Sequence, residues 1–96
     1  MIKSFGSKVA EDVYNGIKSR YARSLPRELH SKACRLFDQL NVITKVETLR
    51  VPPSNHLEKL KGNLTDFWSI RINLQWRIIF KWADDNAWLV DIVDYH

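Results

Sequence analysis

Two arginines in the second half of this 96-residue chain are spaced so that a β-hairpin would bring them together. Large apolar residues occupy even-numbered positions on both sides of residues 73–75 (NLQ), which predicts two antiparallel strands joined by that three-residue loop. In this register Arg71 lies directly opposite Arg77, on the face away from the core. Two adjacent guanidinium groups match the geometry of a phosphate. The spacing therefore indicates an anion site, and the alternative is a pair of arginines that extend into water from a solvated sheet face.

Four further residues can add to such a site. Lys61 and Lys81 would extend its positive field. Tyr95, like Arg71 and Arg77, is at an odd-numbered position, so its side chain is expected on the same face of the sheet, diagonal to Arg77. His96, the last residue, carries an imidazole that suits proton transfer near neutral pH. Strict alternation, however, predicts that its side chain lies on the core face. The alternative is that His96 belongs to a frayed chain end.

The sequence argues against several other kinds of site. Its single cysteine, Cys34, excludes an intrachain disulfide and a zinc site built from several cysteines. His56 has no second His or Cys nearby, which makes it a poor metal ligand. Ser69 has no His and acidic residue at the spacing of a hydrolase triad, and the three glycines form no phosphate-binding loop. We therefore expect neither a metal nor a cofactor.

Helical periodicity dominates the first half of the chain. Ser7 can cap a helix that runs to about Tyr21, although Gly16 lies inside it and weakens it by about 1 kcal/mol relative to alanine. Residues 24–26 (SLP) predict the start of a second helix, so about three residues would join the two helices as an antiparallel hairpin. One apolar stripe marks this second helix: Leu29, Ala33, Leu36, Phe37, Leu40 and Ile43. Residues 2–5 are expected to form a short strand.

The rest of the chain predicts a sheet after an irregular segment. Residues 44–63 are expected to be irregular, because Pro52 and Pro53 exclude a helix interior or a central strand. The period-two pattern then predicts three strands, the last two joined by a turn at 84–86 that sets Trp82 opposite Trp88. On the core face the expected cross-strand pairs are Ile72 with Trp76, Ile70 with Ile78 and Trp68 with Phe80. The expected fold is α+β, with a short N-terminal strand, a two-helix hairpin and a twisted antiparallel sheet in one domain over residues 1–96.

The composition is that of an ordinary globular protein with a modest positive charge. The net charge is +4 and the sequence pI is about 9.4. Lys and Arg are interleaved with Asp and Glu, so this charge fits RNA or an acidic protein partner equally well. No apolar run is long enough for a membrane helix, and the first residues lack a hydrophobic signal stretch. Together with the single cysteine, these features favour the cytoplasm and no membrane partner.

Five short stretches, in order along the whole chain, resemble the HigB toxins of the RelE/ParE superfamily, which come from bacterial type II toxin–antitoxin systems. They are residues 1–5 (MIKSF), 60–63 (LKGN), 67–73 (FWSIRIN), 75–80 (QWRIIF) and 94–96 (DYH). Each stretch alone is a weak signal, whereas the ordered set that ends in DYH is specific. The resemblance implies a RelE-like fold, which agrees with the periodicity.

The resemblance also implies an activity, that of a ribosome-dependent endoribonuclease that cuts mRNA in the ribosomal A site and arrests translation. It places Lys61, Arg77, Tyr95 and His96 in the active site, with Arg71 as a contact to the RNA backbone. Such cleavage needs no metal, because the substrate's own 2′-hydroxyl attacks the adjacent phosphate and leaves a 2′,3′-cyclic phosphate. His96 would transfer protons, and Arg77 would stabilise the negative charge of the transition state.

One position departs from the family pattern. Several HigB toxins carry a histidine three positions before the lysine of the LKGN stretch, and this chain has Glu58 there. Glu58 can act as a base at that position. We therefore include Glu58, with Lys81, among the candidate contacts to the substrate.

The implied partners are mRNA, the ribosome and a HigA-like antitoxin with a helix-turn-helix domain. Operator DNA would be bound only through the toxin–antitoxin complex. Two alternatives remain open at the level of sequence. One is a ParE-like poison of DNA gyrase, a relative that shares the fold but generally lacks the terminal Tyr-His. The other is a non-enzymatic basic binding module whose arginines only solvate the sheet.

Overall fold

The computed structural model describes residues 1–95, and the catalytic prediction for His96 lies outside the described residues. The helices are α1 (Lys8–Asn15) and α2 (His30–Val42), and the strands are β1 (Glu58–Lys59), β2 (Phe67–Arg71), β3 (Trp76–Ala83) and β4 (Asn86–Asp94). Short 3₁₀ helices, η1 to η5, lie at Ala22–Ser24, Arg27–Leu29, Val46–Arg50, Pro53–Asn55 and Gly62–Leu64. The fold is α+β, as predicted.

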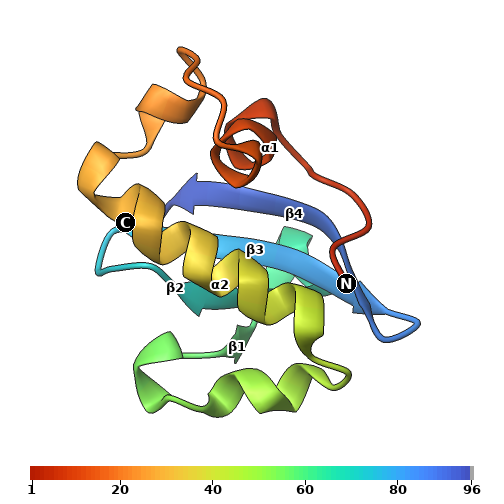
Figure 1. Ribbon diagram of the computed structural model, residues 1–96. Coiled ribbons are helices and arrows are strands. Elements are labelled where there is room, and N and C mark those ends of the chain that lie inside the picture. The colour runs from red at the N-terminus through yellow and green to blue at the C-terminus, as the bar shows by residue number, and fades with distance from the viewer. Residues whose placement is uncertain (96) are drawn as a thin grey trace.

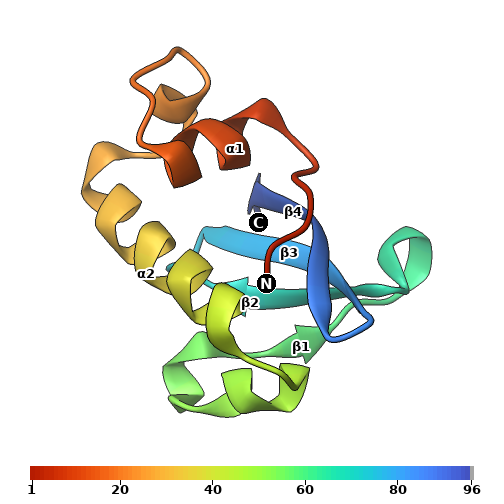
Figure 2. The same ribbon diagram turned by 45° about the vertical axis from the view of Figure 1, so that its right-hand side comes forward.

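The strands form one antiparallel sheet in the order β1-β2-β3-β4, and both helices lie on the same face of it (Figure 1). The segment that carries η3 and η4 lies beside the β1 edge of the sheet (Figure 2). Strand β1 was not predicted. It has only two residues, both exposed, so it leaves no periodic pattern in the sequence.

The main core lies between α2 and the helix-facing side of the sheet. Phe37 and Leu40 of α2 are fully buried in one cluster with Ile70, Ile78 and Phe80. The predicted stripe on α2 is confirmed, with Leu29 partly buried and its other members buried. The predicted pairs Ile70–Ile78 and Trp68–Phe80 are also confirmed.

The turn before β4 differs from the prediction by one residue. Asp84 and Asp85 alone form it, both with positive φ (53° and 60°), as a two-residue hairpin turn of the type I′ class requires. A bulge then shifts the register between β3 and β4, and Leu89 takes φ 52°. The two-residue turn, which lies before the bulge, sets Trp88 opposite Lys81, so the predicted pairing of Trp82 with Trp88 is wrong.

The first helix is shorter than predicted. Ser7 caps it as expected, its hydroxyl accepting a hydrogen bond from the Ala10 N–H. Gly16, however, adopts a left-handed conformation (φ 69°) and ends the helix after Asn15. Residues 16–29 then connect α1 to α2, so the prediction of a helix to Tyr21 and a three-residue connection is wrong.

The N-terminal segment attaches to β4 rather than forming an extended strand. Ile2 and Phe5 make isolated parallel bridges to Ala87 and Val90. The Lys3 N–H donates to the Ala87 carbonyl at 2.7 Å. The predicted short N-terminal strand is thus a pair of bridges at the β4 edge. Within residues 1–95, no helix combines the length and hydropathy needed to cross a membrane.

Cys34, on α2, is half-buried, and its Sγ lies 3.5 Å from the Val13 carbonyl oxygen. Burial, and then the negative charge of Asp38, raise the pKa of the Cys34 thiol. A raised pKa leaves less reactive thiolate at a given pH. We therefore predict that iodoacetamide alkylates Cys34 more slowly in the folded chain than in urea at the same mildly alkaline pH, followed by mass spectrometry. Equal rates in the two states would contradict this environment.

Candidate active site

Arg77, on β3, is the centre of the polar cluster on the face away from the helices. It is buried, with 5% of its surface exposed. Its Nη1 donates a hydrogen bond to the Ser69 hydroxyl at 2.6 Å and lies 3.5 Å from the His56 carbonyl oxygen. Its Nη2 forms an ion pair with Glu58 at 3.3 Å. These contacts hold the guanidinium in one orientation before any ligand arrives.

Tyr95, which follows β4, covers the same guanidinium. The Cζ of Arg77 lies 4.9 Å from the centre of the Tyr95 ring, a cation–π arrangement. Arg77 is paired with Val93 in the sheet, so Tyr95 stands diagonal to it, as predicted. The tyrosine itself is 43% exposed, which leaves part of its ring open to solvent.

Arg71, at the end of β2, lies directly opposite Arg77, which confirms the predicted cross-strand pair. The Nε of Arg71 is buried and has no hydrogen-bond partner among residues 1–95. A buried donor without a partner costs free energy, of the order of 1–3 kcal/mol. Unlike the guanidinium of Arg77, that of Arg71 is thus not held at its Nε by the described part of the chain.

Glu58 reaches the cluster because β1 pairs it with Ser69. Its carboxylate is about half exposed, while the Arg77 side chain is 6% exposed, so the ion pair sits at the rim of the cluster. A phosphate that approaches Arg77 would compete with this carboxylate. The structure thus brings together four of the predicted site residues, Glu58, Arg71, Arg77 and Tyr95.

The two predicted lysines stand apart from Arg77. Lys81 lies opposite Phe67, with its Nζ 5.4 Å from the centre of that ring. Lys61 follows β1 and is exposed, and its side chain forms no hydrogen bond or ion pair within the described part of the chain. Both can add positive charge at longer range, but neither forms a hydrogen bond or ion pair with the Arg77 cluster.

Sequence reasoning missed the part played by Ser69. The serine fits no hydrolase triad, and its hydroxyl instead accepts a hydrogen bond from Arg77 in a fully buried position. One signal was available, since Ser69 shares the odd parity of both arginines and stands among large apolar residues. Within residues 1–95, no three His, Cys, Asp or Glu side chains cluster as metal ligands would.

The arrangement can bind and stabilise an anion. A guanidinium held by fixed hydrogen bonds in a buried position interacts more strongly with developing negative charge than a mobile surface arginine does. The second arginine faces it across the hairpin, and the aromatic ring beside it can stack on a nucleobase.

Known proteins resemble this chain in sequence and in fold. A family model described as RelE-like toxin of type II toxin–antitoxin system HigB matches residues 3–96. Toxin HigB-1 of Vibrio cholerae is 36% identical over 87 residues, which are 91% of this chain and 90% of that protein. Endoribonuclease HigB of Proteus vulgaris is 38% identical over 40 residues, covering 42% of this chain and 44% of that protein.

Solved structures agree in fold. The YoeB–YefM complex from Staphylococcus aureus contains a chain with a TM-score of 0.62 and 22% identity, matched over 100% of this chain and 98% of that one. The YoeB/ParE toxin from Agrobacterium tumefaciens matches with a TM-score of 0.56 and 17% identity, over 99% of each chain. The chain therefore belongs to the HigB family of RelE-like toxins of type II toxin–antitoxin systems.

Proposed function

We propose that this chain is an endoribonuclease that cuts mRNA on the ribosome and thereby inhibits translation. The observation that carries the proposal is the buried Arg77, fixed by Ser69 and Glu58 and covered by Tyr95. The endoribonuclease from Proteus vulgaris supports the same chemistry over the part of the chain that it matches. We also propose that residues 1–96 act as one toxin domain.

The proposed reaction is an internal transesterification. The 2′-oxygen of the substrate forms a bond to the adjacent phosphorus, the bond from phosphorus to the 5′-oxygen breaks, and a 2′,3′-cyclic phosphate remains. Arg77 stabilises the added negative charge on the phosphoryl oxygens, and Arg71 holds the phosphate backbone. His96 and Glu58 are the groups proposed to move the two protons, one from the 2′-hydroxyl and one to the leaving 5′-oxygen. Lys61 and Lys81 add to the positive field around the RNA.

We further propose that an antitoxin neutralises the chain in the cytoplasm. Structures with this fold include the YoeB–YefM toxin–antitoxin complexes from Staphylococcus aureus. The partner proposed here is a HigA-like protein with a helix-turn-helix domain, and operator DNA would be bound only through that complex.

The test of the proposed function compares two forms of one substrate. Purified protein is incubated with an mRNA that is either free or paused on purified ribosomes, and the cut ends are mapped by primer extension. We expect cuts in the A-site codon only on the ribosome, with a cyclic phosphate on the upstream fragment. Equal cutting of free mRNA would contradict ribosome dependence, and intact mRNA in both reactions would contradict the nuclease.

The hydrogen bond from Ser69 to Arg77 provides a second test. Ser69→Ala removes the acceptor at 2.6 Å and leaves Nη1 with the carbonyl of His56 at 3.5 Å. A hydrogen bond to a charged group contributes about 1.5–3 kcal/mol. We predict a rate of ribosome-bound mRNA cleavage at least about tenfold lower, measured under single-turnover conditions. Ser54→Ala, at an exposed serine, is the matched control and should cleave like the unchanged chain.

A further inference from the structure

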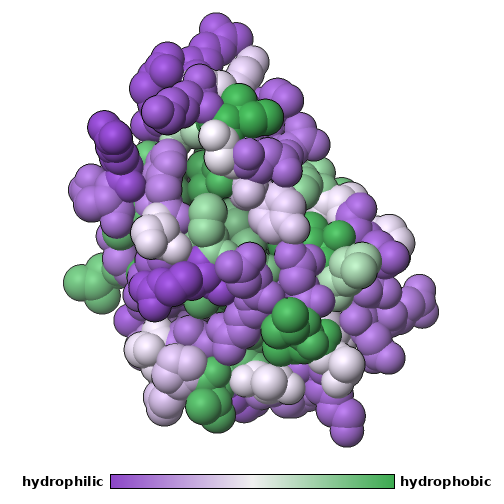
Figure 3. Space-filling model, in the orientation of Figure 1, coloured by the Kyte–Doolittle hydropathy of each residue, from purple (hydrophilic) through white to green (hydrophobic). Residues whose placement is uncertain are grey.

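A cavity of about 560 Å³ opens on the helical side of the molecule, on the opposite side of the sheet from Arg77. It lies between α1, residues 16–29 and the start of α2. Its lining includes Asp12 and Val13 of α1, Ile17, Arg23 and Leu25 of the connecting segment, and His30 of α2. Figure 3 shows this side, where the segment that follows α1 is mostly hydrophilic and hydrophobic residues appear nearer α1. A cavity of this size accommodates one or two large apolar side chains.

The interior of the cavity is apolar. Val13, Ala22 and Leu25 are buried. Ile17, two residues after the end of α1, remains 49% exposed. Gly16 accounts for this exposure, because the left-handed turn that ends α1 carries the chain away from the core. A large aliphatic side chain beside the opening is a ready contact for an apolar group from outside.

The rim of the cavity is positively charged. Residues 13–27 contain Lys18, Arg20, Arg23 and Arg27 and no Asp or Glu. Three of these four basic residues line the cavity, and none forms an ion pair within residues 1–95. Four positive charges in this segment equal the net charge of the whole chain, +4. The rim is therefore complementary to carboxylates.

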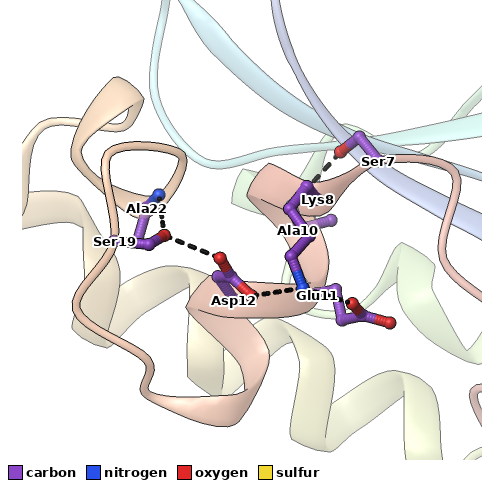
Figure 4. Close-up of polar contacts among 7 residues, drawn as sticks. All are labelled: Ser7, Lys8, Ala10, Glu11, Asp12, Ser19 and Ala22. Atoms are coloured by element: carbon purple, nitrogen blue, oxygen red, sulfur yellow. Dashed lines mark hydrogen bonds and ion pairs between the residues drawn. The ribbon is translucent and has the colours of Figure 1, made fainter.

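A buried carboxylate lies at the floor of the cavity. Asp12 is 1% exposed, and its Oδ2 accepts a hydrogen bond from Ser19 at 2.6 Å (Figure 4). Its Oδ1 is buried and forms an ion pair with the Lys8 Nζ at 3.4 Å. Asp12 is therefore paired within the chain and leaves the basic residues of the rim to an occupant.

We propose that this cavity is the docking site for an acidic segment of a partner protein, which inserts a large apolar side chain and sets its carboxylates on the basic rim. The apolar interior favours a peptide over RNA, because an RNA backbone supplies no apolar anchor. The site is separate from the arginine cluster across the sheet, so its occupation does not depend on the nuclease activity.

The probe is a short fluorescein-labelled peptide in which Glu and Asp flank a single Leu-Phe pair, titrated with the full chain. The control peptide carries Ser-Ser in place of Leu-Phe. We expect the Leu-Phe peptide to bind at least about tenfold more tightly, with amide shifts in the ¹H–¹⁵N spectrum confined to residues 12–30. Equal affinity of the two peptides, or shifts elsewhere, would overturn the proposal.

Two arginine variants that change the net charge by the same amount test where the peptide binds. Arg23→Glu, on the rim, should weaken the Leu-Phe peptide about tenfold, whereas Arg50→Glu, at another exposed arginine, should change its affinity less than about twofold. Ile17→Asp should abolish the difference between the peptides, with circular dichroism unchanged. If both arginine variants weakened peptide binding equally, the binding would reflect the overall charge of the chain, and the proposed site would be wrong. Displacement of the peptide by a short oligouridylate would also overturn the proposal.

Discussion

Replacing Arg77 with alanine is expected to slow mRNA cleavage on the ribosome by about 100- to 1000-fold, the usual cost of removing one preorganised group that stabilises a transition state. The side chain is 5% exposed and is held by Ser69 and Glu58, so its position before catalysis is already fixed. No other described cation makes these contacts, since Arg71 only faces Arg77 across the hairpin and the two lysines form no hydrogen bond or ion pair with the cluster.

Single-turnover cleavage of a ribosome-bound mRNA measures this effect. Arg77→Lys is the informative companion, because it keeps the charge but cannot donate to Ser69 and Glu58 together in the guanidinium geometry. We expect its rate to lie between those of the unchanged chain and Arg77→Ala. Arg50→Ala, at an exposed arginine, controls for the loss of one positive charge. Unchanged cleavage by Arg77→Ala would remove Arg77 from the mechanism.

Replacing Phe37 with alanine should cost about 3–5 kcal/mol in the free energy of unfolding. Phe37 is fully buried on α2, and its ring lies edge-on to those of Phe5 and Tyr14, with centroids 6.3 and 5.7 Å away. It therefore joins three segments, α2, α1 and the N-terminal residues that bridge to β4. Since a small domain has about 5–15 kcal/mol of stability in total, this loss is large.

Urea unfolding followed by tryptophan fluorescence measures the change. Val42→Ala is the matched control, because Val42 ends the same helix but is 76% exposed and should change stability by less than about 0.5 kcal/mol. A loss below about 1 kcal/mol in Phe37→Ala would mean that the ring is not packed as described.

The strand register was predictable because parity alone sets it across a hairpin. Arg71 and Arg77 face each other, and Tyr95 lies beside Arg77, as the alternation of apolar residues implied. Parity fails where one extra residue enters a strand. The two-residue turn puts Trp88 on the face of Lys81, and the bulge near Leu89 then returns Val90 to the core. Alternation alone predicts neither the shorter turn nor the inserted residue.

The remaining differences come from local backbone geometry and tertiary contacts. Apolar spacing continues past Gly16 to Ile17, but the left-handed glycine ends α1 and leaves Ile17 half-exposed. Glu58 meets Arg77 only because a two-residue strand pairs with β2. The hydrogen bond of Ser69 depends on a buried side-chain geometry that periodicity does not encode.

The most direct test of the proposed nuclease is to express this chain alone, under tight control, and to map mRNA 5′ ends across the arrested cells. The His96→Ala and Arg77→Ala variants are mapped beside it. We predict in-frame cuts within coding regions that disappear in both variants. Growth arrest with intact mRNA would contradict the nuclease and favour a ParE-like poison of DNA gyrase.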